Sequence, residues 1–288
     1  MILVTGATGN LGKATIDSLL DRGISPNDIT ALVRDKTKSA ELKLKGLQIK
    51  IGDYQDFESL KNAFQGVDKL LLVSSSSDIS KRFEQHKNAI NAAMETGVGH
   101  IIYTSFDMKN LQQSIMGEEV EYHAYTADHL KRSAIPYTLM NNTMYADMIP
   151  FLVGKDILKN GISTPAGKGK TPFLPISEMA EANAVVLTTA GHENKEYVIA
   201  AETAFSFAEI ADLLSDITGK TIAYHQPELS SYIAQLIDSG ASEDDAAYIS
   251  RFCRAIANGE FNTQRSDVKL LIGRSPVSLK DFFQNIYG

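Results

Sequence analysis

Three glycines near the beginning of the 288-residue chain have the spacing of a nucleotide-binding turn. They follow the apolar run Ile2–Val4, and the complete motif is Gly6, Ala7, Thr8, Gly9, Asn10, Leu11 and Gly12. A turn without Cβ atoms lets a pyrophosphate approach the backbone, and the start of the following helix offers free N–H donors and the positive end of a dipole. The spacing is GxxGxxG where the commoner pattern is GxGxxG, but the physical logic is the same. The motif predicts a dinucleotide site.

Arg34 follows the second predicted strand, where NAD-specific sites usually carry an Asp or Glu that holds the ribose hydroxyls. Lys36 and Lys38 follow two and four residues later. A guanidinium can pair bidentately with a 2′-phosphate, which a carboxylate would repel. The adjacent Asp35 weakens this argument, and the segment could instead be a solvated basic loop. On balance the sequence favours NADPH over NADH.

Polar residues also follow the third and fourth predicted strands. Asp53 could accept a hydrogen bond from an adenine amino group with Tyr54 beside the ring, or Asp53 could cap the next helix. Ser74, Ser75 and Ser76 begin a run of four serines at the sheet edge where ligands bind in such folds. Their small side chains leave room for a ribose or a nicotinamide, although a plain loop is the alternative interpretation.

Candidates for chemistry lie further along the chain. His123 and Tyr125 are the polar candidates on a predicted helix over 120–133, although both could simply pack or face water. Phe106, just past the fifth predicted strand, could stack on a planar acceptor or close the core. Cys253 lies in an apolar helix and is expected in the core. The histidines show no metal-ligand spacing, so no metal is expected.

These residues must be positioned by an alternation of short apolar strands and amphipathic helices. The predicted strands are Ile2–Val4, Ile29–Val33, Leu47–Ile51, Lys69–Val73, His100–Thr104, Tyr137–Met140 and Tyr197–Ala200. The predicted helices include Phe57–Phe64, Arg82–Thr96, Val120–Ser133, Ser177–Thr189, Phe207–Thr218, Ser230–Ser239, Glu243–Ala257 and Leu279–Ile286. This pattern predicts an α/β protein with a Rossmann-like, doubly wound parallel sheet.

The regularity weakens after Asp147, where prolines interrupt the chain. We therefore expect a dinucleotide-binding domain over 1–147 and a smaller, mostly helical substrate domain over 148–288. The chain is expected to return to the first sheet at about 177–200.

The composition excludes several classes of protein. The chain is 43% hydrophobic and 22% charged with a net charge of −7, which argues against a nucleic acid as the direct partner. The lone Cys253 cannot form an internal disulfide, and no apolar run reaches the roughly 20 residues that a membrane helix needs. We expect a cytoplasmic protein that does not enter a membrane, with a homodimer as the candidate assembly.

With these residues in view, the chain resembles the NmrA-like group of atypical short-chain dehydrogenases, and within it the bacterial NADPH-dependent quinone oxidoreductases. The matching segments are Val4–Gly12, Leu32–Arg34, Lys69–Ser76, Gln85–Asn88, Ile102–Ser105, Pro136–Leu139 and Leu271–Arg274. The resemblance implies NADPH at the glycine turn, Arg34 on the 2′-phosphate and Ser74–Ser76 beside the ribose. It also implies that Asn142, Met144 and Tyr145 border the nicotinamide and the substrate.

The sequence departs from its relatives at the residues that donate protons. The Tyr-x-x-x-Lys motif of ordinary short-chain dehydrogenases is absent, and a lysine common in NmrA-like enzymes falls at Asp128, with Lys131 an uncertain substitute. The family's Arg-Asn-Gly-Trp-Tyr stretch reads Asn141-Asn142-Thr143-Met144-Tyr145. Alcohol oxidation and carbonyl reduction need a proton donor beside the reacting carbon. Quinone reduction is less demanding, because the acceptor is already electrophilic.

Three functions follow in order of preference. The first is NADPH-dependent hydride transfer to a quinone or a similar electrophilic acceptor, a small molecule. The second is a non-catalytic redox sensor that binds NADP(H), which the departures at Asp128 and Asn141 support. The third is a sugar-nucleotide epimerase or reductase, which the fold alone suggests and the missing Tyr-x-x-x-Lys motif disfavours.

Overall fold

The computed structural model describes residues 1–154 and 156–288. Within them, seven parallel strands form one sheet in the order β3-β2-β1-β4-β5-β6-β8. The strands are β1 (Ile2–Val4), β2 (Ile29–Val33), β3 (Gln48–Ile51), β4 (Lys69–Leu72), β5 (His100–Phe106), β6 (Tyr137–Asn142) and β8 (Lys195–Ile199). The strand order reverses between β1 and β4, and a crevice for ligands opens at the carboxyl ends of strands at such a switch point. The predicted Rossmann-like, doubly wound sheet is confirmed.

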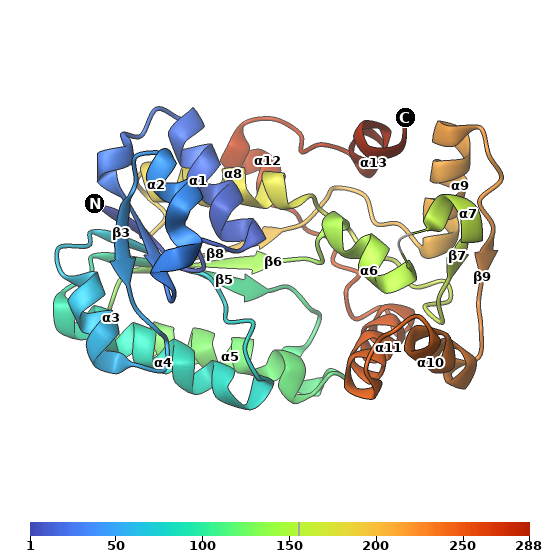
Figure 1. The fold of residues 1–288 in the computed structure, drawn as a ribbon, viewed down its shortest axis with the longest axis horizontal. Coiled ribbons are helices and arrows are strands. Elements are labelled where there is room, and N and C mark those ends of the chain that lie inside the picture. The colour runs from blue at the N-terminus through green and yellow to red at the C-terminus, as the bar shows by residue number, and fades with distance from the viewer. Residues whose placement is uncertain (155) are drawn as a thin grey trace.

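Helices cover both faces of this sheet (Figure 1). One face carries α1 (Asn10–Asp21), α8 (Ile176–Thr188) and α12 (Val268–Ile272), and the other carries α3 (Phe57–Phe64), α4 (Ile79–Thr96) and α5 (Glu118–Arg132). The short α2 (Ala40–Leu44) lies beside β3. Because both faces are covered, the strands can be buried almost throughout, as β4 and β5 are.

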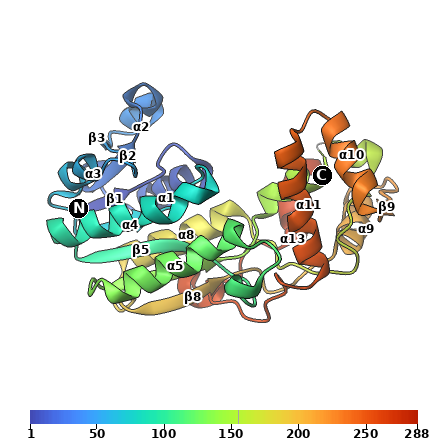
Figure 2. The ribbon, with the colours of Figure 1, turned by 90° about the horizontal axis from the view of Figure 1, so that it is seen from below.

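A smaller helical lobe with a core of its own stands at the carboxyl end of the sheet (Figure 2). It contains α6 (Ile149–Val153), α7 (Ile157–Asn160), α9 (Phe207–Thr218), α10 (Leu229–Asp238), α11 (Glu243–Ala257) and α13 (Leu279–Tyr287), with the paired strands β7 (Ile162–Ser163) and β9 (Tyr224–His225). Phe173, Phe207 and Phe261 are buried in this core, as is Cys253. None of the helices in the described residues is long and apolar enough to cross a membrane.

Two strands run further than their sequence pattern predicts. β5 continues to Phe106 and β6 to Asn142, and these two residues are direct partners in the ladder. Backbone pairing between the two strands stabilises the residues beyond the predicted ends, and the local sequence pattern does not predict that pairing. Two candidate residues thereby come side by side at the carboxyl edge of the sheet.

The chain returns to the sheet lobe twice. The first return, α8 and β8, occurs close to the predicted range. The second is α12, which packs on α8 and β8 and was not predicted, because five residues are too few to show a helical period. A domain boundary near 147 stays a prediction.

Arg274, just after α12, joins this second returning segment to α8. Its guanidinium donates to both carboxylate oxygens of Glu178 on α8, at 2.9 and 3.1 Å, and also pairs with Glu181. Glu178 is buried, with 3% of its side chain exposed. A buried carboxylate is costly without a partner, so this pair ties the C-terminal segment to the sheet lobe.

We predict that Arg274→Ala lowers the free energy of unfolding by roughly 2 kcal/mol, or about 4–8 °C in melting temperature, since it leaves Glu178 buried and unpaired. The matched control is Lys87→Ala, which breaks an exposed pair with Glu84 on α4. Thermal unfolding of both variants measures the difference. Equal melting temperatures for Arg274→Ala and the control would contradict this role.

Candidate functional site

The glycine turn is shaped by close contacts of backbone with backbone. Gly6 has φ +59°, a conformation that side chains rarely adopt, and its carbonyl accepts a hydrogen bond from Gly9 N at 2.9 Å. A Cβ on Gly12 would overlap this same carbonyl. Gly9 starts α1 with no side-chain cap, so the first amides of the helix are open to a ligand.

The side chains of the turn divide between core and surface. Ala7 and Leu11 are buried in the core under α1, so they can offer a ligand only their backbone. Thr8, Gly9 and Asn10 are exposed.

The Thr5 hydroxyl joins β1 to β4 just behind this turn. It donates to the carbonyl of Leu71 at 2.9 Å and accepts from the amide of Val73 at 2.8 Å. Tyr54 completes the cluster: its hydroxyl lies 2.5 Å from Thr5 Oγ1 and donates to the carbonyl of Val73 at 2.8 Å. Tyr54 therefore has a structural contact that the sequence did not suggest, and its hydroxyl is not free for a ligand.

Asp53 does not cap the next helix, so that alternative is wrong. Asp56 is the N-cap of α3 and accepts a hydrogen bond from Ser59 N. Asp53 accepts from Gln55 N at 2.9 Å and stabilises the local turn. It remains half-exposed beside the end of β3, where a bound adenine could reach it.

Arg34 stands at the end of β2 with an exposed side chain. Burial raises the pKa of Tyr54, and the hydrogen bond with Thr5 and then the charge of Arg34 oppose this shift. The adjacent Asp35 does not compete for the same ligand. Its carboxylate caps the following turn, accepting from the amide and the hydroxyl of Thr37 at 2.8 and 2.6 Å, and these bonds lower its pKa.

The serine loop after β4 is held in place by α4. Gln85 Oε1 accepts from the hydroxyls of Ser75 and Ser77 at 2.6 and 2.7 Å, and His86 Nε2 accepts from the amide of Ser75 at 2.8 Å. The Ser75 hydroxyl is therefore engaged by the protein itself, contrary to expectation. Ser76 is exposed and Ser74 half-exposed, so these two remain the candidates for contact with a ribose.

Asn142, at the end of β6, is the most unusual polar residue of this edge. It is 1% exposed, and neither atom of its side-chain amide makes a hydrogen bond of good geometry within the described residues, although the Tyr145 hydroxyl is close enough for the amide to lower the pKa of that group. Buried amides are almost always satisfied, so an unpaired one points to a partner that binds there. The two following candidates separate: Met144 packs in the core of the helical lobe, and Tyr145 packs against the sheet lobe. Burial raises the pKa of Tyr145 to about 12.

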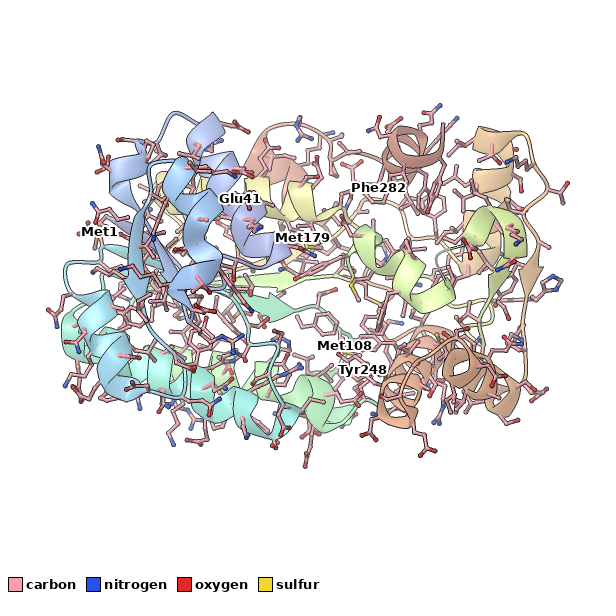
Figure 3. The ribbon with its side chains drawn as sticks, viewed as in Figure 1. Met1, Glu41, Met108, Met179, Tyr248 and Phe282 are labelled. Atoms are coloured by element: carbon pink, nitrogen blue, oxygen red, sulfur yellow. The ribbon has the colours of Figure 1, made fainter. Side chains whose placement is uncertain are left out.

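His123 lies at the same edge. Its ring stacks on Phe106 with centroids 5.5 Å apart and planes 23° apart, and Phe106 meets Phe261 of the helical lobe edge-on. Phe106 therefore closes the seam between the two lobes and forms a wall beside His123. Figure 3 shows Met108, from the loop after β5, and Tyr248, on α11, at the same junction.

Tyr125 is misplaced for a role at this edge. It is two residues from His123 and so points to the other side of α5, where it is 46% exposed and donates to Glu121 at 3.1 Å. Asp128 lines a surface cavity of about 460 Å³ with Tyr125. Lys131 pairs with Glu196, near the beginning of β8, at 2.6 Å. Neither Asp128 nor Lys131 therefore takes the place of the lysine that many NmrA-like enzymes carry in this helix.

Two kinds of residue near the site escaped the sequence reasoning. Gln85 and His86 belong to a segment shared with the family, but no spacing rule connects them to a loop ten residues away. Asp107, one residue after Phe106, carries no motif at all. In residues 1–154 and 156–288, no cluster of three His, Cys, Asp or Glu side chains could hold a metal ion.

Comparison with known proteins agrees with this arrangement. The NmrA-like family matches residues 1–269. Quinone oxidoreductase 2 of Escherichia coli is 32% identical over 288 residues, covering 100% of this chain and 99% of the relative. The crystal structure of the Citrobacter sp. triphenylmethane reductase complexed with NADP(H) has a TM-score of 0.92 and 33% identity, covering 99% of each chain. The NADPH-dependent quinone oxidoreductase of Escherichia coli complexed with NADPH has a TM-score of 0.92 and 31% identity, covering 100% of each.

Asp107 gives a pH-dependent prediction. Burial raises the pKa of its carboxyl to about 6 from 3.8, although a hydrogen bond from Thr263 and the charge of Arg265 oppose the shift. Its Oδ2 is buried without a partner. Because the folded state binds this proton more tightly than the unfolded state, the contribution to stability is complete below about pH 4 and is lost as the pH rises through about 6.

Asp107→Asn should therefore be more stable than the parent protein by about 2 kcal/mol near pH 7 and equal to it near pH 4, measured without cofactor. The control Asp238→Asn changes an exposed carboxylate on α10. A stability difference that is the same at both pH values would contradict the buried-acid account.

Proposed function

The chain belongs to the NmrA-like family, and from this premise we propose that it is an NADPH-dependent oxidoreductase that transfers hydride to a quinone or a similar electrophilic acceptor. One edge of the sheet combines a turn that fits a dinucleotide with an apolar wall at Phe106, and the chain lacks the Tyr-x-x-x-Lys motif. This combination is the observation that carries the proposal. Such an edge suits an acceptor that needs orientation more than a strong acid. The relatives named as quinone oxidoreductases support this choice.

The chain's own residues fit the cofactor. The open amides of α1 would face the pyrophosphate, Arg34 the 2′-phosphate, and Ser74 and Ser76 a ribose. The buried amide of Asn142, whose nearest polar neighbour is Tyr145, would complete its hydrogen bonds on the nicotinamide end. When bound, NADPH supplies the hydride.

The remaining residues act on the acceptor. Phe106 offers a flat apolar surface that excludes water from the edge and orients a planar ring. Met144 is buried on the helical-lobe side of the same segment and would shape the pocket from behind. Small-molecule acceptors of the quinone class fit this apolar surrounding. A cytoplasmic location and a homodimer stay predictions.

Arg34→Gln tests the cofactor assignment. It should weaken NADPH binding about 10- to 100-fold, because a charge-assisted pair with the 2′-phosphate is lost, and leave NADH binding unchanged. The control is Lys43→Gln, which removes an exposed charge of the same sign on α2. Titration calorimetry with both cofactors gives the four affinities. An equal loss for NADPH and NADH, or no loss, would show that Arg34 does not read the 2′-phosphate.

The activity itself is tested by following NADPH oxidation with a panel of benzoquinones and naphthoquinones, with NADH in parallel and with spontaneous reduction subtracted. We expect quinone-dependent oxidation that prefers NADPH. Tight cofactor binding without turnover on any acceptor would favour the alternative, a redox sensor of the NmrA type. Turnover of a nucleotide sugar would favour the epimerase.

A further inference from the structure

A buried chain of hydrogen bonds connects the cofactor loop to His123. It begins at the amide of Ser75, which donates to His86 Nε2 at 2.8 Å. This nitrogen must therefore be unprotonated, so the proton of the neutral His86 ring sits on Nδ1. Burial lowers the pKa of His86 to about 3, and the charge of Arg82 acts in the same direction, so the ring stays neutral.

The next member is Thr126. Its hydroxyl donates to the carbonyl of Tyr122 at 2.7 Å, which uses its only proton. It must therefore accept from His86 Nδ1–H, 2.9 Å away. The orientation of His86 is thus fixed at both ring nitrogens, from the serine loop on one side and from α5 on the other.

The hydroxyl of Tyr103 links His86 to His123. It is buried, 3.5 Å from His86 Nδ1 and 2.8 Å from His123 Nδ1. His86 Nδ1 is a donor, and Thr126 is the other polar neighbour of this hydroxyl, but His123 Nδ1 is the nearest acceptor, so we assign the proton of Tyr103 to a hydrogen bond that His123 Nδ1 accepts. Burial, with the charge of Arg82 acting in the same direction, holds the pKa of His123 well below its usual range, so this ring is neutral as well.

A neutral His123 that accepts at Nδ1 carries its proton on Nε2. This N–H has no hydrogen-bond partner among the described residues, and His123 is 6% exposed. The ring stacks on Phe106, whose ladder partner is Asn142. The free donor thus stands at the carboxyl edge, beside the proposed nicotinamide end of the site.

We propose that Tyr103 is a positioning residue that fixes His123 as the Nε2–H tautomer, and that His123 donates this hydrogen bond to the acceptor's oxygen. The inference rests on the proposed function. A quinone that gains a hydride gains two electrons and one proton, and becomes a hydroquinone monoanion with its charge on oxygen. His123 stabilises that charge and keeps its proton, and water supplies the second proton to give the hydroquinone.

The tautomer can be read without turnover. Nitrogen NMR of protein labelled at histidine distinguishes a protonated from an unprotonated ring nitrogen, and His123→Leu identifies the resonances. We expect His123 Nδ1 to be unprotonated in the parent protein and partly protonated in Tyr103→Phe. A protonated Nδ1 in the parent protein would overturn the inference, whatever the activity.

Kinetics test the consequence. Tyr103→Phe should lower kcat about 10- to 100-fold, most for the least electrophilic quinones, which need the most help with the developing charge, with an unchanged Kd for NADPH. Adding it to His123→Leu should cause little further loss, since Tyr103 acts through His123. The control Tyr125→Phe removes an exposed hydroxyl from α5, the helix that carries His123, and should leave kcat unchanged.

The outcomes separate the two proposals. An unchanged kcat in Tyr103→Phe, or fully additive losses in the double variant, would overturn the inference while the proposed function stands. A parent protein that reduces no quinone but shows the expected tautomer would contradict the proposed function, and with it the donor role of His123, while supporting the role of Tyr103.

Discussion

The Thr5 hydroxyl holds β1 and β4 together where the strand order reverses, and the site is built around that contact. One side-chain oxygen bonds the carbonyl of Leu71, the amide of Val73 and the hydroxyl of Tyr54. The glycine turn follows directly, and Val73 Cβ would lie 3.1 Å from a Cβ placed on Gly6. The turn therefore needs glycine because β4 is so near, and the same nearness places the serine loop beside the turn.

The local part of this site is readable from sequence. Glycine spacing after a short apolar run gives the turn, and runs of buried residues give most strands within one or two positions. The helical period could also have separated His123 from Tyr125, since two residues span about 200° of a helix. What spacing cannot give is the partner of a polar group: Tyr54 meets Thr5 across 49 positions, and Lys131 meets Glu196 across 65.

The same limit explains the other differences. The Ser75 hydroxyl donates to Gln85 and not to a ligand, because α4 carries Gln85 within hydrogen-bond distance of the serine loop. Asp56 replaces Asp53 as the cap of α3, since both positions suit a cap and only backbone geometry decides between them. The short α12 depends on its packing against α8 and on the pair between Arg274 and Glu178, two residues that lie 96 positions apart in the chain.

The central claim is that hydride passes directly from bound NADPH to the acceptor at this edge. The most direct measurement is a single-turnover reaction of the protein–NADPH complex with a naphthoquinone, using cofactor deuterated at either hydrogen of the reactive nicotinamide carbon. A fixed cradle predicts that deuterium at one position slows the reaction severalfold and is transferred, while deuterium at the other is retained. Loss of label from both positions, or no reaction while NADPH remains bound, would contradict the account.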